Sequence, residues 1–252
     1  MNNFEYHDKW KNRVTGRMKK HVYLFGGKQM TGVTTVLGVI AKPALIQWAA
    51  DMACQLIGTA EKDRLGNYVV TNELLESART AHTKKKEDAG TKGTDTHALV
   101  EEYIKECIEN GGNAELRIKE AIDGIDPVLN KFIGWAVGNG VKFLASEKKV
   151  YSESWFVAGT FDFSFEKDGK RFVGDLKTMG KIWDRVPHFQ AAAYRKMSVE
   201  MGEPDYDGTC IVNISKPSEK YPSELTESWS YDWEGDTQAF EAALTLYRKL
   251  NN

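Results

Sequence analysis

Two aspartates stand where a β-hairpin would place them face to face. Asp162 lies in segment 159–165, where phenylalanines alternate with polar residues in the pattern of a half-buried strand. Asp168-Gly169 follows and is a strong signal for a two-residue type I′ turn, because both central positions of that turn require positive φ. If these two residues form the loop, Asp162 lies directly across from Asp175 on the returning strand.

Opposed carboxylates on neighbouring strands, with Cβ atoms about 5 Å apart, repel each other unless a cation lies between them. Hard cations such as Mg²⁺ bind carboxylate oxygens and keep water and substrate phosphate in their remaining positions. Lys177 lies on the same strand face as Asp175, and in the same register it faces Thr160. Its ammonium could hold the attacking water or the scissile phosphate. Such a set of groups performs metal-assisted phosphodiester hydrolysis.

Two helix-like segments supply further candidates. His97 falls in the first turn of a helix that a preceding threonine would cap, and apolar residues follow it at helical spacing. A neutral imidazole there could bind a metal, whereas capping or surface roles are commoner for such a histidine. The second segment is opened by Pro187 and places Gln190 and Tyr194 on one helical face. Taken alone, Tyr194 would be a core residue.

Four short patterns therefore occur in order along the chain: Gly93-Thr94-x-x-His97, Gly159-Thr160-x-Asp162, Asp175-x-Lys177-Thr178 and Gln190-x-x-x-Tyr194. Over residues 90 to 200 they resemble the RecB-like branch of the PD-(D/E)XK nucleases. That branch includes the nuclease domains of RecB and AddB, CRISPR-associated RecB-like nucleases and many phage exonucleases. An acidic residue two positions before a lysine is not specific, since Glu147-Lys148-Lys149 also fits; the order of the four patterns carries the resemblance.

The resemblance implies a role for each matching position. The catalytic residues that it implies are Asp162, Asp175 and Lys177. The ligands that it implies for Mg²⁺ or Mn²⁺ are His97, Asp162, Asp175 and the carbonyl of Leu176. The residues that it implies for contacts with the DNA backbone, or for support of the site, are Gln190, Tyr194, Thr160 and Thr178.

Glu147 is a further acidic candidate for the site, and the number of cysteines bears on the choice of cofactor. Glu147 lies on the strand-like segment 141–151, where relatives often carry an acid; a solvated glutamate between lysines is the competing interpretation, and Glu153 competes for the role. Several relatives hold an iron–sulfur cluster with four cysteines. This chain has three, which are far apart in sequence, so we expect no iron–sulfur cluster.

The order of predicted elements indicates an α/β protein in which helices flank a central mixed sheet. The resemblance implies that this core is restriction-endonuclease-like. Residues 1–90 are expected to form an N-terminal, mainly helical region packed on a nuclease core of residues 91–252. Besides the hairpin, we expect strands at 141–151, 209–214 and 228–233, and helices that begin at Pro43, Pro127 and Pro187 or cover 71–88 and 237–250.

Composition limits the class of protein. The 252 residues, 41% of them apolar, allow one substantial core. The net charge of −2 requires any DNA surface to be a local basic patch, for which the candidates are Lys84, Lys85, Lys86, Lys92, Lys181, Arg185, Arg195 and Lys196. A polar N-terminus, scattered cysteines and the lack of a long apolar run predict the cytoplasm of a bacterial or phage-infected cell, without membrane contact.

The sequence thus predicts a Mg²⁺- or Mn²⁺-dependent DNA exonuclease, used in phage or bacterial DNA recombination or processing. Its partner would be DNA, as linear single- or double-stranded ends, and family likeness adds a single-strand annealing protein or a helicase. Two alternatives stay open. One is a structure-selective endonuclease acting on flaps or branches. The other is a DNA-binding module without hydrolysis, against which the intact Asp162, Asp175 and Lys177 argue.

Overall fold

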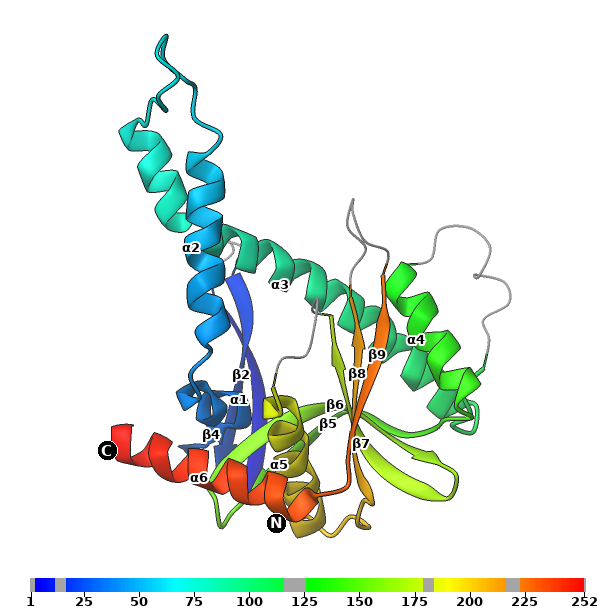
Figure 1. Cartoon of the computed structure of the whole chain (residues 1–252). Coiled ribbons are helices and arrows are strands. Elements are labelled where there is room, and N and C mark those ends of the chain that lie inside the picture. Colours follow the sequence, from blue (N-terminus) through cyan, green and yellow to red (C-terminus); the bar gives the residue numbers. More distant parts are fainter. Residues whose placement is uncertain (1–2, 12–16, 116–125, 179–183, 216–222, 252) are drawn as a thin grey trace. The chain divides into compact units, whose positions relative to one another are not determined.

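The computed structural model describes residues 3–11, 17–115, 126–178, 184–215 and 223–251 (Figure 1). They form a mixed α/β structure in which helices flank a mixed multi-stranded sheet, so the predicted fold class is confirmed at this level. The chain divides into two compact units. The larger unit comprises residues 1–39 and 98–252, and the smaller unit comprises residues 40–97.

The larger unit is built on a six-stranded sheet with the strand order β4-β6-β7-β8-β9, in which β5 also pairs with β6. Pairing is parallel for β4 with β6 and for β7 with β8, and antiparallel for the other pairs. The strands are β4 Thr31–Gly32, β5 Lys142–Ser152, β6 Val157–Lys167, β7 Lys170–Lys177, β8 Gly208–Ile214 and β9 Leu225–Ser230.

Strand β6 shares one of its edges between two partners. Strand β5 pairs with β6 along the other edge, over nearly the whole length of both strands. On the shared edge, β4 pairs with Val157 and Ala158, and β7 pairs with Phe163 to Lys167. Residues 159–162 therefore lie between two ladders. This short stretch of β6 contains Asp162.

Helices cover both faces of this sheet (Figure 1). On one face, residues of α4 (Pro127–Gly138) and of the last part of α3 (Asn72–Glu109) form a core with buried side chains of β5 to β8, among them Phe163, Leu176 and Val212. Helix α5 (Val186–Glu200) lies on the other face, since its His188 bonds to Thr209, which alternates with the core residues of β8. Helix α6 (Trp233–Asn251) packs against α5.

Most of the described residues before Val33 lie in strands, which corrects the expectation of a helical region over 1–90. Strands β1 (Phe4–Lys11), β2 (Arg17–Phe25) and β3 (Lys28–Gln29) form an antiparallel sheet of their own. Aromatic residues at alternate positions of β1 and β2 pack against the main sheet, around buried Tyr23, Met30 and Ala158. This period-two pattern is that of a half-buried strand. The predicted boundary at residue 90 is also wrong, because residues 1–39 belong to the larger unit. They continue through α1 (Val33–Val36) and the 3₁₀ turn Leu37–Val39.

The smaller unit consists of α2 (Pro43–Ile57), which begins at Pro43 as predicted, a connecting loop, and the first part of α3. Helix α3 is continuous from Asn72 to Glu109. The predicted helix start near His97 is therefore wrong. No proline interrupts residues 72–109, and each of the two glycines there, Gly90 and Gly93, costs a helix only about 1 kcal/mol relative to alanine.

The other predicted elements are present with shifted ends. Helix α4 begins as expected, because the Asp126 carboxylate accepts hydrogen bonds from the amides of Val128 and Leu129 and Pro127 occupies the first helical position. Strand β9 lies three residues earlier than predicted, and α6 begins at Trp233 instead of residue 237. Among the described helices, none has the length and apolar character needed to span a membrane.

Candidate active site

The hairpin of β6 and β7 has the predicted turn and register. Asp168 and Gly169 have φ angles of 53° and 73°, as a type I′ turn requires. The ladder extends from this turn to the pair Phe163–Gly174, and every pair follows the expected register. Glycine is required at 174, because a Cβ atom there would lie 2.2 Å from the Phe163 ring. The sequence thus correctly predicted the turn and the register of the strand pairs next to it.

The ladder ends before it reaches Asp162, which corrects the predicted pairing of Asp162 with Asp175 and of Thr160 with Lys177. The physical cause is the shared edge of β6, where residues 159–162 lie between the ladders with β4 and β7. Instead of facing a paired strand, the Asp162 carboxylate accepts a 2.8 Å hydrogen bond from the Leu176 amide. The two aspartates remain neighbours, since the charge of Asp162 raises the pKa of Asp175.

Asp175 and Lys177 form a buried ion pair. Asp175 is only 2% exposed, and the Lys177 Nζ atom lies 2.8 Å from its Oδ1 and 2.6 Å from its Oδ2. Oδ2 is buried without a partner in hydrogen-bond geometry, so one carboxylate oxygen is held by charge attraction alone. Burial raises the pKa of Asp175 to about 6, with Lys177 opposing the shift and Asp162 adding to it.

The pKa of Lys177 is also raised, although burial acts on it in the opposite direction. Burial acts to lower the pKa of Lys177, but the carboxylates of Asp175 and Asp162 outweigh burial and raise it above its ordinary value. Lys177 is therefore an ammonium at neutral pH. A permanently charged ammonium, that of Lys177, therefore contacts the Asp175 carboxylate, whose pKa is raised.

Glu147 joins this group from the neighbouring strand. Strand β5 pairs with β6 on both sides of this position, through Ser146–Phe163 and Lys148–Phe161, so Glu147 lies across from Asp162. Its φ of 47° is left-handed in the middle of a strand, a conformation that costs about 1–3 kcal/mol for a non-glycine residue and is characteristic of functional sites.

The environment of Glu147 also differs from that of a solvated side chain. Burial first, and then the charges of Asp162 and Glu101, raise its pKa to about 7. Glu153, its competitor, is exposed in the turn after β5. The geometry therefore favours Glu147 as the third carboxylate of the group.

Gln190 and Tyr194 on α5 lie together, as their spacing predicted, and Gln190 Nε2 donates a 3.0 Å hydrogen bond to the Tyr194 hydroxyl. Tyr194 is buried, and its ring lies against Gly159, where a Cβ atom would be 2.5 Å from it. Burial raises the pKa of Tyr194 well above its ordinary value; Gln190 opposes this, and the charges of Asp175 and Asp162 add to it. Its hydroxyl is therefore a neutral group beside the acids.

Thr160 and Thr178 lie at the two ends of this region. The Thr160 hydroxyl is 3.1 Å from the hydroxyl of Tyr23 on β2, and Thr178 is half-buried directly after β7. Tyr23 was not predicted as part of the site. Its alternation with Phe25 and His21 is the signal that could have indicated a strand with one aromatic face.

The remaining predicted ligands stay predictions. His97 lies inside α3 and belongs to the smaller unit, whereas both aspartates belong to the larger one. The Leu176 amide bonds to Asp162 and its side chain lies in the core, so only its carbonyl is left for the predicted role. Over the described residues, no three His, Cys, Asp or Glu side chains are arranged to hold a metal ion.

The residues around Asp175 nevertheless suit a hard divalent cation. The donors are carboxylate oxygens, and one of them, Asp175 Oδ2, is buried and has the Lys177 ammonium at 2.6 Å but no partner in hydrogen-bond geometry. Burial, together with the charge of Asp162, raises the pKa of Asp175 to about 6 and that of Glu147 to about 7. A cation beside them would relieve that repulsion. Asp162, Asp175 and Glu147 are therefore the residues that fit it.

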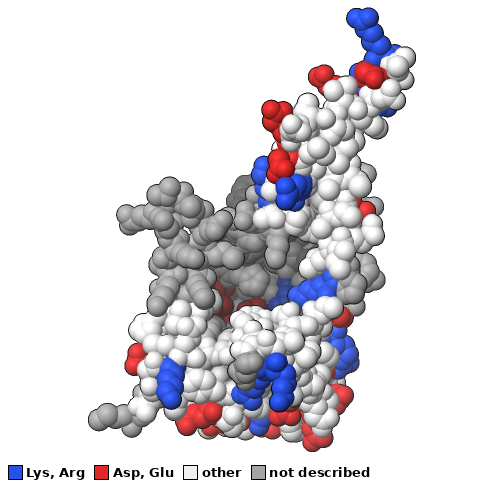
Figure 2. All heavy atoms as spheres, turned by 90° about the vertical axis from the view of Figure 1, so that its left-hand side faces the viewer, with Lys and Arg blue, Asp and Glu red and all other residues white. Residues whose placement is uncertain are grey.

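The candidate basic residues separate into several kinds. Arg195 is buried and bonds to Asp205 and to the Tyr206 carbonyl, so it is a structural residue and not part of a DNA surface. Lys196 pairs with Glu200. Lys84 and Lys85 are exposed on α3, and Lys181 lies outside the described residues. On the face drawn in Figure 2, the coloured Lys and Arg side chains form small groups among acidic and neutral ones.

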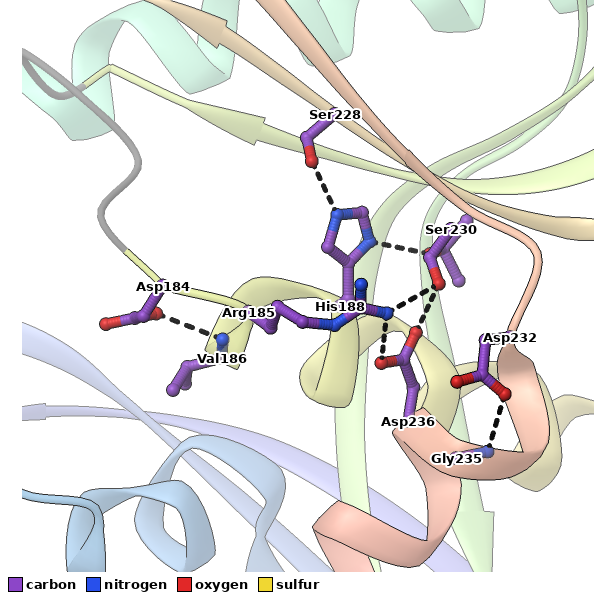
Figure 3. A network of polar contacts seen from close by, with 10 residues as sticks. Asp184, Arg185, Val186, His188, Ser228, Ser230, Asp232, Gly235 and Asp236 are labelled. Atoms are coloured by element: carbon purple, nitrogen blue, oxygen red, sulfur yellow. Dashed lines mark hydrogen bonds and ion pairs between the residues drawn. The ribbon is translucent and has the colours of Figure 1, made fainter.

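Arg185 belongs to a polar network that fixes the start of α5 (Figure 3). Its guanidinium donates to Asp236 Oδ1 at 2.8 Å and to the Ser230 hydroxyl at 3.0 Å, and Ser230 in turn bonds to Asp236. One turn further, His188 lies between the hydroxyls of Thr209 and Ser228, at 2.9 and 2.8 Å. The network ties α5 to β8, β9 and α6, and it therefore holds the helix that carries Gln190 and Tyr194.

Comparisons with known proteins add little. No family model matches the chain, and no curated protein matches it. Thirteen chains of solved structures match. One of them, titled "Crystal structure of SSO0001", has 11% sequence identity over 62% of this chain and 88% of that one, with a TM-score of 0.27. A likeness at that level carries no argument about fold or activity.

Proposed function

We propose that this chain is a metal-dependent deoxyribonuclease with a restriction-endonuclease-like core, of the RecB-like PD-(D/E)XK type. It acts as an exonuclease that hydrolyses phosphodiester bonds of DNA in phage or bacterial recombination or processing. The observation that carries the proposal is the buried Asp175–Lys177 pair beside Asp162 and Glu147. A protein that only stabilised its fold has no need for three neighbouring carboxylates, two of them with raised pKa values.

Each residue of the group has a distinct task. Asp162 and Asp175 would hold Mg²⁺ or Mn²⁺, with Glu147 as a third carboxylate from the next strand. A bound divalent ion supplies an activated water and neutralises charge on the phosphate. The Leu176 amide orients Asp162 by its hydrogen bond to Oδ2.

Lys177, Gln190 and Tyr194 would act on the substrate. The Lys177 ammonium can donate a hydrogen bond to the attacking oxygen or to a non-bridging oxygen of the scissile phosphate, where negative charge grows in the transition state. The neutral Tyr194 hydroxyl, placed by Gln190, can donate to the DNA backbone beside the acids. The raised pKa of Tyr194 ensures that this hydroxyl keeps its proton at neutral pH.

A cleavage assay tests the proposal. Purified protein is incubated with end-labelled linear single-stranded and double-stranded DNA and with closed circular DNA, in magnesium, in manganese and in chelator. The proposal predicts metal-dependent degradation of linear DNA only. Lys177→Met keeps the length and apolar stem of the side chain and removes the ammonium, so it should abolish most of the activity.

Two other results of the cleavage assay would support the two alternative functions. Efficient cutting of closed circles would replace the exonuclease by a structure-selective endonuclease. Tight binding of DNA in chelator, with no cleavage in either metal, would support a binding module of the same fold. As a control, Lys170→Met removes a lysine from the other end of β7, next to the turn and away from the acids, and should cleave like the wild type.

A further inference from the structure

Lys149 is a cation beside the carboxylates of the candidate site. It lies two residues beyond Glu147 on β5, about 7 Å along the strand, and it pairs with Thr160 on β6. Burial and the charges of Asp162 and Glu101 raise the pKa of Glu147, and the charge of Lys149 is the larger of two that oppose them. The Lys149 ammonium is therefore close enough to the acids to act on a ligand that they hold.

The partner of the Lys149 ammonium is an aromatic ring. Its Nζ atom lies 4.5 Å from the centre of the Tyr6 ring, a cation–π contact. The ring is fixed by its own contacts, since it stacks on His21 at 5.6 Å and packs against Tyr23 at 5.5 Å between ring centroids. Within the part of the chain that the structure describes, the Lys149 ammonium forms no hydrogen bond or ion pair. It therefore keeps its N–H donors for an anion.

The adjacent lysine on β5 is paired in the ordinary way. The Lys148 ammonium forms an ion pair with Glu203 at 2.5 Å, after the end of α5. Adjacent residues of a strand point to opposite faces of the sheet, which is why Lys148 and Lys149 have different partners. Both side chains are half-buried. A half-buried charge without an ion-pair partner is unfavourable unless a ligand supplies one, so Lys149 has the properties of an anion-binding residue.

We propose that Lys149 binds the DNA backbone phosphate next to the scissile one, with its ammonium held in place by the Tyr6 ring. The carboxylates and their metal ion would bind the scissile phosphate, but the carboxylates repel the other phosphates of the same strand. An ammonium beside the acids offsets this repulsion, and its contact with a fixed ring reduces the side-chain entropy lost on binding. The inference rests on the proposed function for its choice of DNA, and it deepens that function by assigning a second phosphate contact.

A binding experiment in chelator tests the phosphate contact without requiring cleavage. Fluorescence anisotropy of a labelled single-stranded thymidine oligomer gives the Kd at several salt concentrations. Lys149→Met keeps an apolar stem on the Tyr6 ring and removes the charge. It should raise the Kd about fivefold to tenfold at low salt, and it should reduce the slope of log K against log salt by about 0.7, the value for one phosphate on a single strand. Lys149→Arg keeps the charge and should bind within about twofold of the wild type.

Lys148→Met is the matched control, because it removes the same charge from the adjacent position of β5. The Lys148 ammonium pairs with Glu203 instead, so the Kd and the salt slope should stay those of the wild type. Cleavage assays in Mn²⁺ then locate the contact, with oligomers in which one phosphate is replaced by a neutral methylphosphonate. At one linkage beside the cleaved bond, the neutral group should raise the KM of the wild type but not that of Lys149→Met, with kcat unchanged in both.

Several results would overturn the inference. Wild-type affinity and salt slope in a cooperatively melting Lys149→Met protein would do so, as would an equal loss of affinity in Lys148→Met or wild-type binding that does not depend on salt. A neutral linkage that affects wild type and Lys149→Met equally at every position would also contradict it. The outcome is separable from that of the proposed function. Weaker binding by Lys149→Met, when the wild type cleaves nothing, contradicts only the nuclease, and cleavage with an unchanged KM in Lys149→Met contradicts only the phosphate contact.

Discussion

Replacement of Asp175 by asparagine should remove a pH dependence from the stability of the metal-free protein. Burial raises the pKa of Asp175 from 3.8 to about 6. The folded protein therefore holds this proton more tightly than the unfolded chain does. Stability must then fall as pH rises from the lower to the higher value, because the folded state binds more protons over that range.

The size of the effect follows from the two pKa values. A rise from 3.8 to about 6 corresponds to roughly 3 kcal/mol of lost stability in the ionised state, at about 1.4 kcal/mol for each pH unit. Asparagine keeps the shape and a carbonyl that can accept from Lys177, but it does not titrate. Relative to wild type, Asp175→Asn should therefore gain most of that amount between about pH 4 and pH 7. Asp175→Ala is a poorer test, because it leaves the Lys177 ammonium buried without a partner.

Urea denaturation in chelator at several pH values measures this difference. Identical slopes of unfolding free energy against pH for wild type and Asp175→Asn would refute the raised pKa and the burial that causes it. A second arm adds Mn²⁺ or Mg²⁺ at neutral pH. Wild type should be stabilised in proportion to the logarithm of metal concentration and Asp175→Asn much less, which tests metal binding without any DNA.

Three further predictions concern neighbouring positions. Lys177→Met should raise the pKa of Asp175 further, so in chelator it should lose more stability than wild type as pH rises, seen by the same urea titrations. Gly159→Ala forces a Cβ atom against the Tyr194 ring, so it should lower the free energy of unfolding by about 1–3 kcal/mol and reduce cleavage in parallel. Its control is Gly134→Ala in the exposed middle of α4, where no atom lies within 4 Å of the new Cβ; this variant should be neutral or stabilising in thermal melts. Burial lowers the pKa of His188 below 6.5, so its contribution to stability is complete above pH 6.5 and is lost as pH falls below it; a non-titrating His188→Asn protein should show a flatter profile there.

The hairpin and its residues could be predicted because the information is local. Alternating phenylalanines, the Asp168-Gly169 turn and the positions of the acids all lie within twenty residues of one another, and the turn alone fixes the register. The separation of the strands at Asp162 could not be predicted. It depends on β4, a two-residue strand more than a hundred residues earlier in the chain, whose pairing occupies the same edge of β6.

The structure differs from the sequence-based prediction at other places too, and each difference has its own physical cause. The threonines and Gly93 before His97 look like a helix start, but local preference of this kind is a weak guide when a helix can continue on both sides. In β1 and β2 the alternation of aromatic residues was present, yet lysines and arginines on the same segments hid it behind an overall basic composition. The left-handed backbone at Glu147 has no sequence signal at all, because glutamate has no preference for it.

The shared edge of β6 explains why the acidic groups lie where they do. A strand paired along both edges commits its backbone amides and carbonyls to the ladders, and those of its neighbours as well. Because β7 leaves β6 after Gly174, the Leu176 amide is free of that ladder and bonds to the Asp162 carboxylate instead. This bond holds the Asp162 carboxylate against β7 at the residue after Asp175, while β5, still paired on the other edge, places Glu147 across from Asp162. A full β6–β7 ladder would instead pair Asp162 with Asp175, so the short strand β4 decides that the Asp162 carboxylate bonds to the Leu176 amide and does not face a paired aspartate.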